Sequence, residues 1–252
     1  MGRELLRAAL DQAEINRLIT RYWRVSVVEL TSTTQGDLVQ LVRDGKANAG
    51  DVIVAEYQSA GRGRLDRSFE AAKGSALLFS FYIEPKRNRD DWGWIPLIAG
   101  YCVAKTLHAY DAKIKWPNDI LIRGKKVSGL IAEVAGDGVV VGIGINVGME
   151  ERELPVDTAT SLLLEGAADL TRDQILCELL EEFEEHFSQW DKGIDEVQPL
   201  YVQLSETLGK DVRIEYPGGA THLATAESIS DTGALVLDDG THVQSADVIH
   251  LR

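Results

Sequence analysis

The stretch KIKWPNDILIRGKKVSGLIAEVAGDGVVVGIGINV, residues 113–147, decides the fold. Apolar, β-branched runs alternate in it with the hairpin-type segments Arg123-Gly124 and Gly136-Asp137-Gly138, which favour tight reversals between neighbouring strands. The pattern therefore predicts four consecutive antiparallel strands, at residues 112–116, 119–123, 127–135 and 138–146.

Further strands and several helices are expected on either side of this stretch. Strands are predicted at residues 25–30, 51–57 and 75–83. Apolar periodicity predicts helices at residues 4–21, within 31–45, and at 96–110. A capping box at Thr171–Gln174 indicates the start of another helix, with one apolar face. Together, these strands and helices predict an α+β fold, with a mixed, mostly antiparallel sheet packed against helices.

The pattern changes near Leu208. Short strand-like segments follow, separated by turn sequences such as Asp231-Thr232-Gly233 and Asp239-Gly240. We therefore expect a main domain at residues 1–207 and a small second domain at 208–252. The second domain has few apolar residues, so we expect it to lean on the first.

Composition limits the function. The net charge of −14 argues against a nucleic-acid partner, because such proteins carry a basic face. Positive charge is nevertheless concentrated locally: residues 61–67 hold three Arg against one Asp, and residues 113–126 hold four Lys and one Arg against one Asp. Two such segments in an acidic chain favour binding of a small polyanion.

The chain shows no apolar run near 18 residues and no signal-peptide pattern, so we expect no membrane partner and a cytoplasmic location. Cys102 and Cys177 fall in helix-like apolar stretches, and we expect both to be buried, reduced thiols. No Cys/His spacing indicates a metal site, so none is predicted.

The loop Gly61-Arg62-Gly63-Arg64-Leu65-Asp66-Arg67 follows a strand-like run. Its glycines let the backbone approach a ligand, and its arginines supply forked donors for an anion. It is not a Walker A loop, because the Gly-Lys-Ser/Thr ending is missing. An exposed, solvated loop is the alternative. Like charges and glycine also predict that it stays disordered until a ligand binds.

Together these segments resemble the catalytic domain of biotin protein ligases. The pieces occur in that family's order and spacing over about residues 25–150. They are Ser32-Thr33, Gly61-Arg62-Gly63-Arg64-x-x-Arg67, Lys115-Trp116-Pro117-Asn118-Asp119, Lys126-x-x-Gly129 and Gly142-x-Gly144-x-Asn146. The C-terminal segment resembles that family's small SH3-like barrel, so the resemblance covers nearly the whole chain.

The resemblance implies a biotin–[biotin carboxyl carrier protein] ligase that forms an adenylate and then an amide bond. Biotin and ATP would give biotinyl-5′-AMP and pyrophosphate, with Mg²⁺ accompanying ATP. The biotinyl group would then pass to a lysine of a biotin carboxyl carrier domain, as in acetyl-CoA carboxylase. Some relatives carry an N-terminal helix-turn-helix domain, for which the residues before Val25 leave no room, so a form without DNA-binding function is expected.

The resemblance also assigns roles to residues. Lys126 would meet the biotin carboxylate and the reacting phosphate, Arg64 the phosphate, and Asp119 the incoming lysine. The implied biotin contacts are Ser32, Thr33, Thr34, Gln58, Arg62, Gly63, Arg64, Lys126 and Gly129. The implied nucleotide contacts are Arg62, Arg64, Arg67, Phe69, Lys115, Asn118 and Asn146. Leu130, Ile131 and the Gly142–Gly144 strand are candidates for an apolar wall.

This chain departs from the family pattern at two positions, because Thr34 replaces the usual Asn and Phe69 the usual Trp. Simpler structural roles also stay open. Lys126 is alternatively an idle hairpin-tip lysine beside Lys125, Ser32-Thr33 a helix N-cap, and Asp119 a turn cap. For the whole chain, the alternatives are a lipoate-type ligase, a non-catalytic biotin sensor or repressor, and a nucleotide-binding module without acyl transfer.

Overall fold

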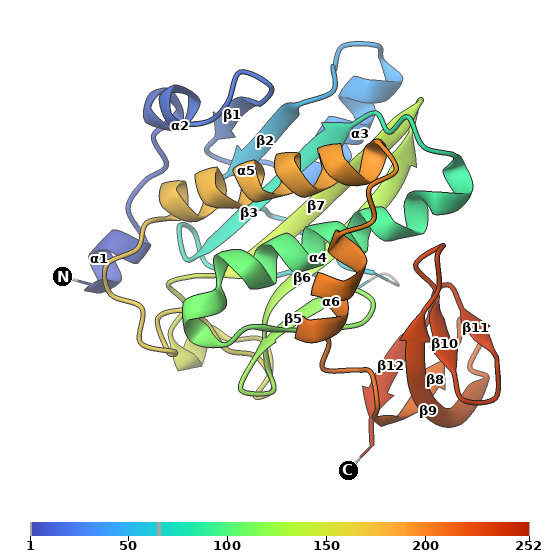
Figure 1. Cartoon of the computed structure of the whole chain (residues 1–252). Helices are drawn as coiled ribbons and strands as arrows, with labels where there is room; N and C mark the ends of the chain where they lie inside the picture. The colour runs from blue at the N-terminus through green and yellow to red at the C-terminus, as the bar shows by residue number, and fades with distance from the viewer. Residues whose placement is uncertain (1, 65–66, 252) are drawn as a thin grey trace.

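The computed structural model describes residues 2–64 and 67–251, which form a large mixed sheet, helices on both of its faces and a smaller second sheet (Figure 1). The strands of the large sheet are β1 (Arg24–Val28), β2 (Asp51–Ala55), β3 (Ala76–Ile83), β4 (Lys113–Lys115), β5 (Asp119–Ile122), β6 (Lys125–Ala135) and β7 (Gly138–Asn146). Their order is β1-β2-β3-β7-β6-β5-β4. Among the strand pairs of this sheet in the described residues, only β1 with β2 is parallel, which confirms the predicted mostly antiparallel sheet.

The hairpin signals are confirmed. Arg123 and Gly124, between β5 and β6, have φ angles of 50° and 75°, as expected for a type I′ turn. Gly136, between β6 and β7, has a φ of 57°. Every residue of β3 and β7 is buried, because these central strands are covered on both faces.

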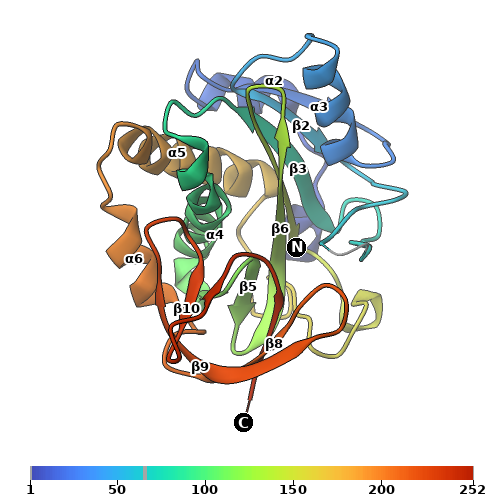
Figure 2. The same cartoon turned by 90° about the vertical axis from the view of Figure 1, so that its right-hand side faces the viewer.

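Helices cover both faces of the large sheet. They are α1 (Gly2–Leu6), α2 (Gln12–Leu18), α3 (Thr34–Arg43), α4 (Trp94–Thr106), α5 (Arg172–Asp191) and α6 (Val197–Leu204), with short 3₁₀ turns at Arg89–Gly93, His108–Tyr110 and Glu151–Glu153. Figure 2 shows α3 on one face and α4 with α5 on the other. The predicted capping box of α5 is present, with Thr171 and Gln174 bonded reciprocally. Cys102 and Cys177 are buried and free, as expected.

The single helix predicted at residues 4–21 is wrong. The segment forms two short helices, α1 and α2, separated by an irregular stretch. Asp11 ends that stretch, because its carboxylate accepts hydrogen bonds from the N–H groups of Ala13 and Glu14 and so caps α2. The N–H of Leu10 instead donates to Glu56 Oε1 at 2.7 Å. A helix spanning both halves would lose these two interactions.

Glu56 belongs to a buried ion pair that joins three parts of the chain. Its Oε2 lies 2.6 Å from Nη2 of Arg172, and the two side chains are 5% and 0% exposed. Arg172, the first residue of α5, also donates to the carbonyls of Ala8 and Ala76. The pair therefore ties the N-terminal segment and β3 to the end of β2, where the Gly61–Arg67 loop begins.

Replacing Glu56 by Gln should destabilise the protein strongly, because it leaves the Arg172 cation buried without a counter-charge. Breaking one partner of a buried pair typically costs about 3–5 kcal/mol. We expect a loss of this size in the free energy of unfolding measured by urea denaturation. Glu29→Gln is the matched control, since Glu29 forms an exposed pair with Lys73. Equal midpoints for the two variants would contradict the importance of the buried pair.

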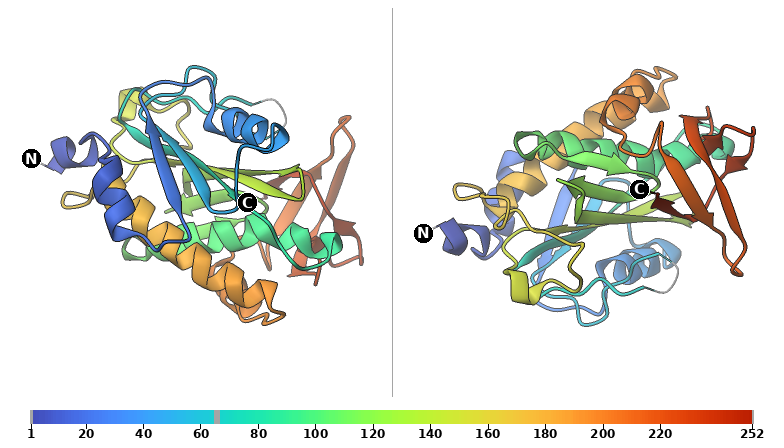
Figure 3. Two further views of the ribbon diagram at one scale, coloured as in Figure 1. Left: turned by 90° about the horizontal axis from the view of Figure 1, so that it is seen from above. Right: turned by 90° about the horizontal axis from the view of Figure 1, so that it is seen from below.

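The C-terminal segment forms a five-stranded antiparallel sheet, in the order β11-β10-β9-β8-β12. Its strands are β8 (Asp211–Glu215), β9 (Thr221–Ile229), β10 (Leu235–Leu237), β11 (His242–Val243) and β12 (Asp247–His250). Figure 3 shows it at the end of the molecule opposite α1. Trp94 and Trp116 donate their indole N–H groups to the carbonyls of Ser230 and Gly233. The small sheet therefore leans on the main body, as predicted.

His250 lies where the small sheet meets β4. Its Nε2 is hydrogen-bonded to Thr207 Oγ1 at 3.1 Å, and the same oxygen accepts the N–H of Trp116. Burial lowers the pKa of His250 to about 4, and the nearby Lys210 and Lys115 act in the same direction. The folded protein therefore holds this imidazole neutral at pH values where the unfolded chain protonates it.

Stability should fall as the pH drops from 6.5, the ordinary pKa of histidine, towards 4, because over this window only the unfolded state takes up the proton. His250→Gln keeps a polar partner for Thr207 but does not titrate. We expect urea midpoints at about pH 7 and about pH 5 to differ less in this variant than in the wild type. An unchanged difference would show that His250 does not contribute to acid destabilisation.

Candidate active site

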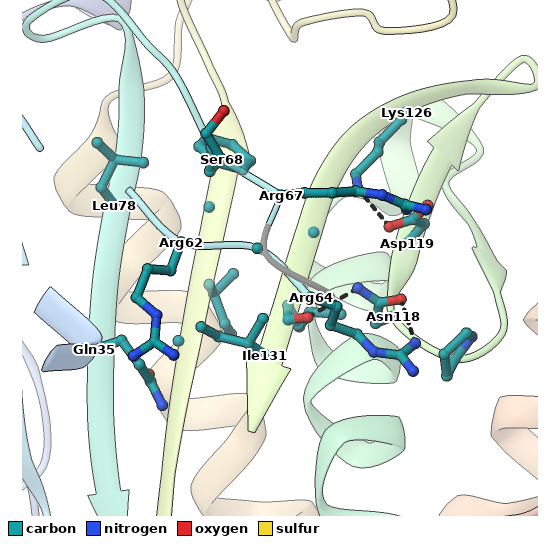
Figure 4. A pocket seen from close by; sticks show the side chains of 18 of the residues that line it. Gln35, Arg62, Arg64, Arg67, Ser68, Leu78, Asn118, Asp119, Lys126 and Ile131 are labelled. Carbon is teal, nitrogen blue, oxygen red and sulfur yellow. Dashed lines mark hydrogen bonds and ion pairs between the residues drawn. The ribbon is translucent and has the colours of Figure 1, made fainter. Parts of the chain in front are cut away.

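One cavity collects most of the predicted site residues (Figure 4). It lies between the start of α3, strands β3, β6 and β7, residues 62–64 and 67–69, and the small sheet. The predicted residues lining it are Thr33, Thr34, Gln58, Arg62, Gly63, Arg64, Arg67, Phe69, Lys115, Asn118, Asp119, Lys126 and Gly129. Leu130, Ile131, Gly142 and Gly144, the candidates for an apolar wall, line it too. Ser32 and Asn146 are not among its lining residues.

Gln58 organises the polar end of the cavity. Its Oε1 accepts the backbone N–H of Thr34 at 2.7 Å and the Thr34 hydroxyl at 3.0 Å. Thr33 occupies the N-cap position of α3, as the alternative interpretation expected, but its side chain makes no capping bond. The amide of Gln58 supplies this bond instead, and it is thereby held against the helix N-terminus.

Thr34 has a clear structural role despite its departure from the family pattern. Because Oε1 of Gln58 can only accept, the Thr34 hydroxyl proton points to it. Ser80 Oγ, at 2.9 Å, then donates to Thr34 Oγ1. Both Thr34 and Ser80 are buried. Thr34 therefore fixes Gln58 in one orientation.

Lys126 and Asp119 form an ion pair at the other end of the cavity. Lys126 Nζ lies 2.6 Å from Asp119 Oδ1, and the two side chains are 40% and 23% exposed. A Cβ atom at Gly129 would lie 3.0 Å from both Cε and Nζ of Lys126. The glycine of the Lys-x-x-Gly spacing therefore leaves room for the lysine to fold back towards Asp119. Lys125, by contrast, is exposed at the hairpin tip.

A β-bulge helps to aim Lys126. The register between β5 and β6 shifts between Ile120 and Leu121, so Leu121 opposes Lys126. The backbone of Lys126 bonds on its other side to Thr158 O and Thr160 N, at 2.8 Å each. Bulges of this kind redirect side chains next to functional sites. The 158–160 segment was missed by the sequence analysis, and it carries no motif that would mark it.

Arg64 connects the Lys115–Asp119 motif to the small sheet. Its Nη1 donates to Asn118 Oδ1 at 3.1 Å, and its Nη2 donates to Ser245 Oγ at 2.9 Å. Asn118 in turn donates to the carbonyl of Leu130. Burial lowers the pKa of the Arg64 guanidinium, against the opposing effect of Asp247 and Asp119; a guanidinium nevertheless remains a cation.

The other two arginines of the loop also have acidic partners. Arg67 pairs with Asp247 of β12, and Arg62 lies 3.9 Å from Glu133. Ser245 and Asp247 were missed by the sequence analysis, which gave the small sheet no part in the site. Leu65 and Asp66 of the same loop lie outside the described residues, so ligand-dependent ordering of the loop stays a prediction.

The glycines of β7 make room for side chains of the cavity. A Cβ at Gly144 would lie 2.6 Å from the Phe69 ring, and one at Gly142 would lie 2.6 Å from Gln35 Oε1. Asn146, at the end of the strand, is buried and donates its amide to the carbonyl of Thr160 at 2.9 Å. Its predicted nucleotide contact stays a prediction.

The cavity is positive within an acidic protein. Its described lining holds five cations, Arg62, Arg64, Arg67, Lys115 and Lys126, and three carboxylates, Asp119, Glu215 and Asp247. The difference of +2 contrasts with the chain's net charge of −14 and suits an anionic ligand. The described residues contain no group of three or more His, Cys, Asp or Glu side chains placed to hold a metal ion.

Comparisons with known proteins agree with the fold. Residues 27–150 match the biotin/lipoate A/B protein ligase family, and residues 207–251 match the biotin protein ligase C-terminal domain. The chain is 37% identical to the biotin–[acetyl-CoA-carboxylase] ligase of Mycobacterium tuberculosis, over 99% of both chains. It is 28% identical to the bifunctional ligase/repressor BirA of Bacillus subtilis, over 87% of this chain and 72% of that one.

A solved structure is also similar. The biotin protein ligase from Aquifex aeolicus in complex with biotin and ATP matches with a TM-score of 0.75 and 26% identity, over 90% of this chain and 98% of that one. The fold and the cationic cavity thus define a ligase of the biotin/lipoate class. Within that class, the C-terminal match and the near full-length relative show that the chain belongs to the biotin protein ligase family. The predicted resemblance is confirmed.

Proposed function

We propose that this protein activates biotin with ATP as biotinyl-5′-AMP and transfers the biotinyl group to a lysine of a biotin carboxyl carrier domain. The observation that carries the proposal is one cavity in which Gln58 and Arg64, from the segment after β2, meet Asp119 and Lys126, from the β5–β6 hairpin. The Mycobacterium tuberculosis relative, named as a biotin–[acetyl-CoA-carboxylase] ligase, supports the same activity and carboxylase.

The first step joins two anions, so it requires cations. A carboxylate oxygen of biotin attacks the α-phosphorus of ATP, and the bond from that phosphorus to the pyrophosphate oxygen breaks. Lys126 offsets the repulsion between the carboxylate and the phosphate, and Arg64 stabilises the charge that develops on the phosphate oxygens. Asp119 holds the Lys126 ammonium in place, and Asn118 and Ser245 hold the Arg64 guanidinium.

In the second step, the amine of the acceptor lysine attacks the acyl carbon. The bond between that carbon and the phosphate oxygen breaks, and AMP leaves with the oxygen. Asp119 is positioned to orient the amine and to accept its proton. The mixed anhydride must be kept from water until then. Phe69, Leu130 and Ile131, which line the cavity, provide the apolar wall for this.

Mg²⁺ enters with ATP as part of the substrate. The described residues offer no cluster of carboxylates and imidazoles for it, so we expect ATP phosphates and water to be its main ligands. The carrier domain as partner and the cytoplasm as location follow from the proposed activity. The described residues include no helix that is long and apolar enough to cross a membrane.

Lys126→Ala should lower the rate of biotin transfer about 10²–10³-fold, because a donor that stabilises transition-state charge is lost. Lys125→Ala is the matched control: it removes the adjacent, exposed lysine and should leave the rate unchanged. The measurement is transfer of labelled biotin to an apo carrier domain with ATP and Mg²⁺, with lipoate as the competing acid. Tight biotin binding without transfer would favour a sensor, and lipoate transfer would favour a lipoate-type ligase.

Asp119→Asn should separate the two steps. Transfer from preformed biotinyl-5′-AMP to the carrier domain should fall about 10²-fold or more, since the proton acceptor is lost. Biotin-dependent pyrophosphate release should fall less, because Lys126 keeps its charge. Equal losses in the two assays would assign Asp119 to holding Lys126 alone.

A further inference from the structure

Gln35 is a buried amide that faces the cavity and that the proposed mechanism leaves without a role. It is the second residue of α3 (Thr34–Arg43), is 2% exposed and lines the cavity. Its Nε2 donates to the carbonyl of Val140 at 3.1 Å. Because a carbonyl oxygen can only accept, this bond fixes the orientation of the amide, and Oε1 is the opposite end.

Oε1 of Gln35 is buried and has no hydrogen-bond partner within residues 2–64 and 67–251. Buried amide oxygens are nearly always paired, since leaving one unpaired costs stability. An acceptor that is buried, oriented and unpaired at the wall of a ligand cavity is expected to receive a donor from the ligand. That donor must be an N–H or O–H group.

The oxygen lies directly against strand β7, beside Gly142. A Cβ atom at Gly142 would lie 2.6 Å from Gln35 Oε1 and 3.1 Å from Ser80 Oγ, so any larger residue at 142 would displace the amide. Figure 4 shows Gln35 at the side of the cavity away from Lys126 and Asp119. If Lys126 meets the carboxylate of the ligand, Gln35 is placed to meet its opposite end.

Gln58 presents the complementary group. Its Oε1 is occupied by Thr34, so Nε2, a donor, is the end left for a ligand. The cavity thus offers an amide acceptor at Gln35 and an amide donor at Gln58. A cyclic urea matches this pair, because it carries N–H donors beside a carbonyl acceptor. A dithiolane ring, as in lipoate, carries no N–H at all.

We propose that Gln35 is a specificity-determining residue whose Oε1 accepts a hydrogen bond from a ureido N–H of biotin. The proposal rests on the proposed function, since it assigns the recognition of biotin's ring within that site. Gln35 selects a ring that carries an N–H donor and rejects one that does not, because the rejected ring leaves the buried oxygen unpaired.

The test compares ligands and variants by calorimetric titration of the full chain. The ligands are biotin and two analogues in which one or the other ureido N–H is replaced by CH₂. Gln35→Met keeps the length of the side chain and removes the acceptor. Gln40→Met makes the same change at an exposed position of the same helix and should bind all three ligands like the wild type.

We expect the wild type to bind one of the two analogues about tenfold or more weakly than biotin. Gln35→Met should bind biotin about tenfold or more weakly, and should lose the discrimination against that same analogue. The KM for ATP in the transfer assay should stay unchanged. Gly142→Ala, which displaces the same oxygen, should reproduce the effect, and it serves as the test if Gln35→Met does not fold.

Three results would overturn the assignment. Undiminished biotin binding by Gln35→Met is the first. The second is discrimination against the analogue that persists in Gln35→Met and Gly142→Ala, since another group would then recognise the N–H. The third is absence of biotin binding by the wild type, which alone would also overturn the proposed function.

Discussion

The buried pair between Glu56 and Arg172 is the constraint on which the position of the site depends. The side chain of Glu56 holds Arg172 and Leu10, while its backbone carbonyl accepts the N–H of Gly74 at 3.0 Å. The loop from residue 57 to residue 73 is therefore closed at its base by one residue. Gln58 and the arginines of the loop start from a fixed point because this base is anchored in the core. A buried ion pair adds little net stability, but it fixes the positions of the segments that carry it, because separating the two charges is costly.

Each principal cation of the cavity has a polar or acidic partner within the protein itself. Lys126 has Asp119, Arg67 has Asp247, and Arg64 has Asn118. These partners limit the repulsion among cations gathered in one place, and they also fix their geometry. Because these side chains are already oriented, they need not reorient when charge develops during the reaction. The small sheet contributes directly here, because Asp247 and Ser245 hold two of the loop arginines.

Local signals in the sequence predicted what local interactions control. The hairpin turns, the strands of residues 119–146 and the capping box of α5 depend on neighbours within a few positions, and all were predicted. The break between α1 and α2 was not predicted: the N-cap of α2 at Asp11 is a local signal that was missed, and the bond from Leu10 depends on Glu56, 46 residues away. Similarly, the cap of α3 comes from Gln58 rather than from Thr33. The polar contacts of the small sheet with the site come from Ser245, before β12, and Asp247, its first residue, and no motif distinguishes them.

The glycines of β6 and β7 make room for side chains that line the cavity. In the structure, Gly142 and Gly144 lie on one face of the strand, and Gly129 of β6 is the register partner of Gly144. Side chains of the protein fill the space above them, since Phe69 lies over Gly144 and Lys126 over Gly129. These glycines thus leave the space that Gln35, Phe69 and Lys126 occupy. A methyl group added at one of the glycines would displace one of these side chains before it met a ligand.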